Sequence, residues 1–158
     1  MRVFVTIAGA VFVMIATAIL AGCSTAPPPS KTPAADATTE PWYGKAVEQL
    51  KAMNQKAHGL LAQHKADEAA SVITAAEPWA ARVVSVPHPT LSAMQAASDL
   101  DELYGRMLLD NRNYGWARMM FQKNVARWRT WKPQTGETLQ YLRAAEAEIA
   151  ECDRRMTQ

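Results

Sequence analysis

The sequence predicts an all-α fold of about five helices, arranged as antiparallel hairpins. Apolar residues recur at spacings of three and four from Tyr43 to Met156, and no segment alternates with a period of two for the length of a strand. Only seven glycines occur in 158 residues, which favours helices over a turn-rich β fold. A chain of this length has room for one ordinary domain, which we place at residues 41–158.

The first helix is expected to begin at Pro41, since proline suits a first helical position, and to run for about six turns. Its apolar stripe comprises Tyr43, Ala46, Leu50, Met53, Ala57, Leu60 and His64. After a break near Lys65, the pattern continues through Ala80, and Pro78 is expected to kink or end this second helix. Segment 83–90 holds two prolines within three residues and predicts a connection.

A third helix is expected to begin at Thr90 or Ser92. Its stripe comprises Leu91, Met94, Ala97, Leu100, Tyr104, Met107 and Leu108. The turn 111–113 is rich in residues that tolerate left-handed backbone, and it leads to a fourth helix over 114–131. Thr135 is expected to cap the last helix. That helix carries the stripe Leu139, Leu142, Ala145, Ile149, Cys152 and Met156. Cys152 is therefore expected to pack in the core as a reduced thiol, with an intermolecular disulfide or a metal ligand as the alternatives.

Residues 1–22 have a different character from the rest of the chain. Val3–Leu20 is a run of 18 residues without a charge, which is at the lower edge of a membrane span. The following Leu20-Ala21-Gly22-Cys23 resembles the lipobox of bacterial lipoprotein precursors. The resemblance implies that residues 1–22 are a signal peptide, that cleavage falls before Cys23, and that Cys23 is acylated and anchors the chain in a bilayer. An uncleaved signal anchor is the alternative.

Residues 23–40 are expected to comprise the acylated cysteine and a disordered tether. The stretch after Cys23 is rich in Pro, Ala and Thr and has no aromatic residue, so it cannot bury enough apolar surface to offset its ordering entropy. Ser24 is not the aspartate that commonly retains enterobacterial lipoproteins in the inner membrane. In a host with two membranes, the resemblance therefore implies the outer membrane, facing the periplasm.

The third and fourth helices contain Gly105, Tyr114, Ala117 and Phe121, separated by nine, three and four residues. This spacing resembles a tetratricopeptide repeat, which implies two closely packed helices and a concave face that binds peptides or partner proteins. The first hairpin matches less well, with His64 and Ala66 standing where glycine and tyrosine are expected. The two units are 48 residues apart, measured from Ala69 to Ala117. Residues 137–156 would then be a capping helix, and a helical bundle without repeats is the alternative.

No pattern in the sequence predicts an enzyme, a cofactor site or a metal site. His58 and His64 are six residues apart and so lie on different helix faces, and His88 lies in the proline-rich connection. No phosphate-binding, nucleophile-elbow or CxxC motif occurs. The carboxylates of Asp99 and Glu102 are typical of a solvated helix face.

The most unusual segment is 106–132, which is basic and rich in tryptophan. Four of its residues are candidates for binding a partner, because Arg and Trp are frequent anchors at interfaces; they are Trp116, Arg118, Arg127 and Arg129. The alternative is a core-facing stripe whose flanking cations pair with acidic neighbours. Asn124 lies within the apolar arc and is expected to form a hydrogen bond across a helix interface.

We therefore expect a membrane-anchored envelope lipoprotein whose helical domain docks onto another envelope protein without catalysing a reaction. The alternative function is direct binding of cell wall or anionic lipid through the basic helix. A nucleic-acid partner is not expected, because the 17 basic and 15 acidic residues nearly balance, and removal of residues 1–22 takes away only Arg2.

Overall fold

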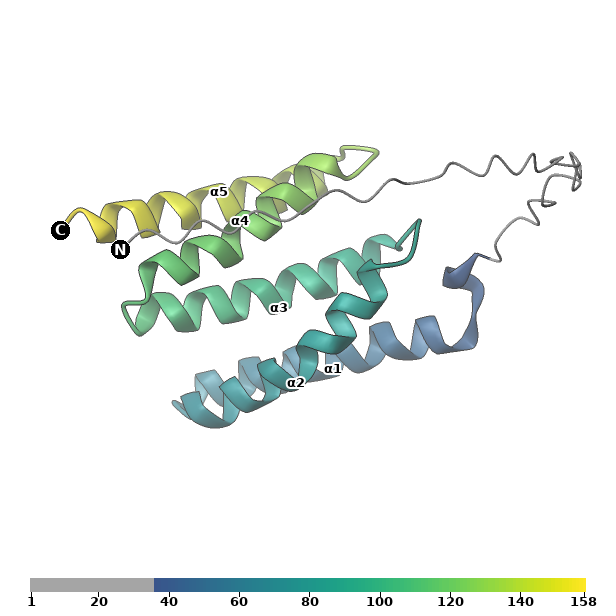
Figure 1. Ribbon diagram of the computed structural model, residues 1–158, viewed down its shortest axis with the longest axis horizontal. Helices are drawn as coiled ribbons and strands as arrows, with labels where there is room; N and C mark the ends of the chain where they lie inside the picture. The colour runs from purple at the N-terminus through teal and green to yellow at the C-terminus, as the bar shows by residue number, and fades with distance from the viewer. Residues whose placement is uncertain (1–35) are drawn as a thin grey trace, which may run out of the picture. The chain divides into compact units, whose positions relative to one another are not determined.

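The computed structural model describes residues 36–158, and this part of the chain is all-α, as the sequence predicts (Figure 1). A short 3₁₀ helix precedes five α-helices. They are η1 (Ala37–Thr39), α1 (Pro41–Ala62), α2 (Ala66–Val84), α3 (Leu91–Asp110), α4 (Tyr114–Thr130) and α5 (Gly136–Met156). The expected signal peptide, Cys23 and most of the expected tether lie outside the described residues.

The ordered chain begins before the expected first helix. The Asp36 carboxylate accepts hydrogen bonds from the backbone N–H and hydroxyl of Thr38, at 3.0 and 2.7 Å, and so caps η1. These two bonds hold the pKa of Asp36 below its usual value. Residues 36–40, expected to belong to the tether, therefore lead directly into α1, which begins at Pro41 as predicted.

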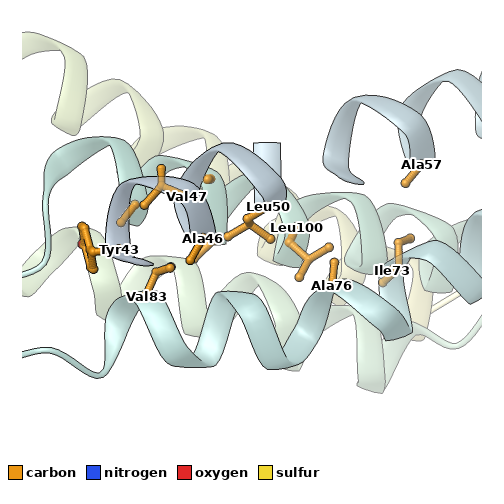
Figure 2. Packing of buried hydrophobic residues seen from close by; sticks show 12 residues of the cluster. Tyr43, Ala46, Val47, Leu50, Ala57, Ile73, Ala76, Val83 and Leu100 are labelled. Atoms are coloured by element: carbon orange, nitrogen blue, oxygen red, sulfur yellow. The ribbon is translucent and has the colours of Figure 1, made fainter. Parts of the chain in front are cut away.

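Each helix runs back along the one before it, and α1 packs against both α2 and α3 (Figure 1). Helix α4 in turn packs between α3 and α5. The main core lies among α1, α2 and α3, where Tyr43, Leu50, Ile73, Val83 and Leu100 are all buried (Figure 2). A second cluster is formed by Ala117, Phe121 and Cys152, so the free Cys152 packs in the core as predicted.

Helix α2 does not end at Pro78. It continues to Val84, and Pro78 lies inside it on the exposed side of the helix. A proline leaves one carbonyl of the preceding turn without its helical N–H, and on this side water can satisfy that carbonyl. Continuation of α2 also brings Val83 into the core with no exposed surface. Of the two expected effects of Pro78, termination is therefore wrong.

The turns that join α1 to α2 and α3 to α4 have the same geometry. His64 and Arg112 occupy the same place in the two turns, and each has a φ of 60°. The N–H after each residue bonds to the carbonyl five positions back: Lys65 to Leu60 at 2.9 Å and Asn113 to Leu108 at 2.8 Å. This is the Schellman motif of helix C-termini. His64, expected on the apolar stripe of the first helix, therefore lies in the turn and is exposed.

These equivalent turns are 48 residues apart, the spacing predicted from Ala69 and Ala117. They pair His64 with Arg112, so the residue that corresponds to Gly105 is Ala57 rather than His64. Gly105 is needed where α3 approaches α4, because a Cβ there would lie 2.7 Å from the Phe121 ring. The glycine and the aromatic residue of the proposed repeat are thus in direct contact.

A polar cluster joins α3 to α4 beside this contact. Asn124 Nδ2 donates a hydrogen bond to Ser98 O at 2.9 Å, and Trp128 Nε1 donates one to Ser98 Oγ at 2.8 Å. All three residues are buried, and Trp128 also stacks on Tyr141 of α5 with ring centroids 4.8 Å apart. The predicted hydrogen bond of Asn124 across a helix interface is confirmed. Buried polar groups that are satisfied in this way fix the register between two helices.

Candidate functional site: a groove between helices α1 and α3

The candidate arginines of α4 are engaged within the chain. Arg127 lies between α3 and α4, where its guanidinium donates to Asp101 Oδ2 at 2.8 Å and to Asn124 Oδ1. The Arg127 side chain is 11% exposed and that of Asp101 is 9% exposed, so this ion pair is buried. Lys123 forms a second ion pair with Asp101. Arg127 is therefore part of the helix interface.

The other two arginines pair with α5. Arg118 Nε lies 2.7 Å from Asp153 Oδ1, and Arg129 donates to Glu146 Oε1 at 2.7 Å. Both pairs retain solvent access, so each contributes little to stability, about 0–1 kcal/mol. All three candidate arginines nevertheless have carboxylate partners inside the domain. This arrangement matches the alternative that the sequence left open, in which the cations of the fourth helix pair with acidic neighbours.

Trp116 is the candidate that remains available on the surface of α4. Its side chain is 62% exposed, and Met119, one turn further along, is 49% exposed. The structure does not bring Trp116 together with Arg127 or Arg129, which pair with groups on α3 and α5 respectively. The four candidates therefore do not converge on one site.

A groove of about 660 Å³ lies between α1 and α3. Its apolar part is formed by Leu61, Ala62, Leu103 and Met107. Its polar part is formed by Asn54, Gln55, His58, Asp99, Glu102, Arg106 and Asp110. None of the candidate residues of α4 lines it. A concave surface that combines apolar side chains with polar groups is typical of a binding site, although polar residues outnumber apolar ones in this lining.

Asn54 gives the groove a buried acceptor without a partner. Its side chain is 7% exposed, and Nδ2 donates to Ala96 O of α3 at 2.7 Å. This bond fixes the orientation of the amide, because the carbonyl of Ala96 requires a donor. Oδ1 then has no hydrogen-bond partner among the described residues. A buried acceptor left unpaired costs about 1–3 kcal/mol, so it is an unusual feature for a helix interface.

The charges of the groove are unbalanced. Arg106 lies 2.9 Å from Glu102 and 3.0 Å from Glu148 of α5, so two carboxylates share the one arginine that lines the groove. Asp99 and Asp110 form no ion pair within residues 36–158. The groove therefore carries an excess of negative charge.

Asp99 is exposed on the surface of α3. Desolvation by the neighbouring residues raises the pKa of its carboxyl, and the charge of Glu102 raises it further. The expectation of a solvated helix face therefore holds for Asp99, whereas Glu102 is only partly exposed and pairs with Arg106. The signals in the sequence were the polar Asn54 next to Met53 of the apolar stripe and the four acidic residues of the third helix, and neither signal predicts a groove.

The fold and the groove define a small all-α protein of helical hairpins with a groove between its first and third helices. No protein-family model, no curated protein and no solved structure matches the chain. Within residues 36–158, no helix is long and apolar enough to cross a membrane. Across the same residues, no group of three His, Cys, Asp or Glu side chains is placed to hold a metal ion.

Proposed function

We propose that the chain is a lipid-anchored envelope protein whose helical domain is a non-catalytic docking module, holding a segment of a partner protein in the groove between α1 and α3. The observation that carries the docking proposal is the groove itself, whose lining includes Asn54, a residue with a buried Oδ1 that has no partner within residues 36–158. A partner segment brings backbone and side-chain N–H groups, which are the donors that such an oxygen lacks.

The resemblance to tetratricopeptide repeats supports the same proposal. The two turns repeat after 48 residues, and Gly105 contacts Phe121 as the helix-packing glycine of such a repeat would. Stacked repeats of this kind form a concave binding surface. Here the groove lies between α1 and α3, which are the first helices of the two hairpins.

Photocrosslinking in native membranes tests the docking proposal. Gln55 lies in the groove and Gln122 lies on the exposed face of α4, so both positions accept p-benzoylphenylalanine in place of an exposed glutamine. We expect one dominant adduct from the Gln55 variant and none above background from the Gln122 variant. Adducts from Gln122 alone would reject the groove as the docking surface.

Lipid anchoring is proposed from Leu20-Ala21-Gly22-Cys23 and is tested separately. After growth with an alkynyl palmitate, the wild-type chain is expected to carry the label and to remain with the membranes. Cys23→Ser is expected to abolish labelling, since serine offers no thiol for the diacylglyceryl transfer. A labelled Cys23→Ser chain would contradict this assignment, whereas Cys152→Ser is the matched control and is expected to be labelled normally.

Direct binding of cell wall or anionic lipid by residues 114–132 has less support. Arg118, Arg127 and Arg129 each have a carboxylate partner inside the domain, which reduces the positive potential of the helix. Trp116 and Met119 are exposed, but two apolar side chains alone give weak attachment to a bilayer.

A further inference from the structure

We infer that the groove between α1 and α3 recognises a cationic side chain, arginine or lysine, in the partner segment, with Asp99 as its counter-charge. This inference rests on the proposed docking function and adds the chemistry of the partner. Its basis is the excess of acidic groups in the groove, with the unpaired carboxylate of Asp99 on α3 opposite Asn54 of α1, whose amide oxygen has no partner within residues 36–158.

Three residues that line this groove each have a hydrogen-bond acceptor without a partner within residues 36–158. The acceptors are the carboxylates of Asp99 and Asp110 and the Oδ1 atom of Asn54. Arg106 donates no hydrogen bond to these acceptors, because its guanidinium is shared between Glu102 and Glu148. A guanidinium offers five N–H donors and an ammonium offers three, and neither accepts a hydrogen bond. A cationic side chain thus matches the unmet requirement of the site in both charge and donor count.

Asn54 Oδ1 is closed off from solvent, so a ligand group reaches it only if neighbouring side chains move. Leu103 and Met107 give the same groove an apolar lining. The methylene stem of arginine or lysine suits such a lining, since these side chains pack their stems on apolar surface while the charged end finds polar partners. The apolar part of the groove would thereby contact the stem of the bound side chain, and the acidic part would contact its charged end.

Asp99 carries a stability cost that binding would offset. Because desolvation and Glu102 raise the pKa of Asp99, its ionised form is less favourable in the folded chain than in the unfolded chain. Stability is therefore lost as the pH rises through the raised pKa, and the cost is fully present at neutral pH. Asp99→Asn is expected to raise the melting temperature at pH 7, whereas a carboxylate that holds the fold together would lower it on removal.

A titration followed by NMR on the full ¹⁵N-labelled chain tests the inference. The probe is Nα-acetyl-arginine amide, and the control ligand is its citrulline analogue, which has nearly the same shape but a neutral urea. We expect the arginine probe to shift the side-chain amide signal of Asn54 and the backbone signal of Asp99 saturably. The citrulline analogue is expected to bind at least about tenfold more weakly, since a charge-assisted hydrogen bond is lost.

Two variants complete the titration. Asp99→Asn is expected to weaken binding of the arginine probe about tenfold or more, and Glu77→Gln, which removes one exposed carboxylate from α2, is expected to leave it unchanged. Equal binding of the two ligands, or no shift of the Asn54 and Asp99 signals, would overturn the inference. If the arginine probe does not bind while the Gln55 variant still crosslinks to a partner, the docking proposal stands and the recognition of a cationic side chain is rejected. If the probe binds but the Gln55 variant gives no adduct, the docking proposal is rejected.

Discussion

Asp101→Ala is expected to lower the free energy of unfolding by about 3–5 kcal/mol, the usual cost of removing one partner from a buried ion pair. Asp101 is 6% exposed, and it accepts from both Arg127 and Lys123 of α4. Without it, the Arg127 guanidinium remains between two helices with no counter-charge, and only Asn124 still accepts from it. Urea unfolding followed by circular dichroism measures the change.

A matched control is the same substitution in an exposed pair. Asp153→Ala removes the partner of Arg118, whose pair is accessible to solvent, so the expected loss is about 0–1 kcal/mol. A further variant, Asp101→Leu with Arg127→Met, removes both charges and is expected to recover part of the stability, since it also leaves Asn124 Oδ1 without its donor. Equal losses for Asp101→Ala and Asp153→Ala would show that the α3–α4 pair is not buried in solution.

Gly105→Ala is expected to destabilise the domain by about 1–3 kcal/mol, although alanine is the better helix former. An added Cβ would lie 2.7 Å from Cε1 and 2.8 Å from Cζ of Phe121, and this ring is fully buried. Protein interiors are close-packed, so a fully buried ring has little room to move and α3 and α4 are expected to separate. Thermal and urea unfolding both report the loss.

Gly59→Ala serves as the control for helix propensity. A Cβ at Gly59 meets nothing within 4 Å, so this variant is expected to gain about 0.5–1 kcal/mol. Combining Gly105→Ala with Phe121→Leu should recover part of the loss, because the smaller side chain leaves room for the methyl group. A Gly105→Ala domain as stable as the Gly59→Ala domain would contradict the close approach of α3 and α4.

The helices could be predicted from sequence because their signals are local. Thr135 caps α5 as predicted, accepting from the Thr138 N–H at 3.2 Å, and Pro41 begins α1. The effect of Pro78 was harder to predict, since it depends on which side of α2 faces solvent. That orientation is set by the packing of α2 on α1 and α3, which is a tertiary property.

The groove could not be predicted because it joins groups from helices that are not consecutive. Asn54 and Asp99 come together only through the packing of α1 on α3. The candidate arginines, in contrast, are close in sequence and share a basic segment, which predicts a common site without information on the fold. Their partners, Asp101, Glu146 and Asp153, lie on α3 and α5, and the folded chain is needed to reveal these pairs.

The docking of a cationic partner segment in the groove is tested most directly by the yield of the Gln55 photocrosslink in native membranes, measured when the charge of the groove is changed. We expect the adduct of the wild-type groove to fall sharply in Asp99→Asn and to persist in Glu77→Gln, with arginine or lysine at the crosslinked segment of the partner. The opposite result would be an adduct whose yield is undiminished in Asp99→Asn and which lies on a partner segment without a cationic residue. That result would contradict binding of a cationic segment in the groove.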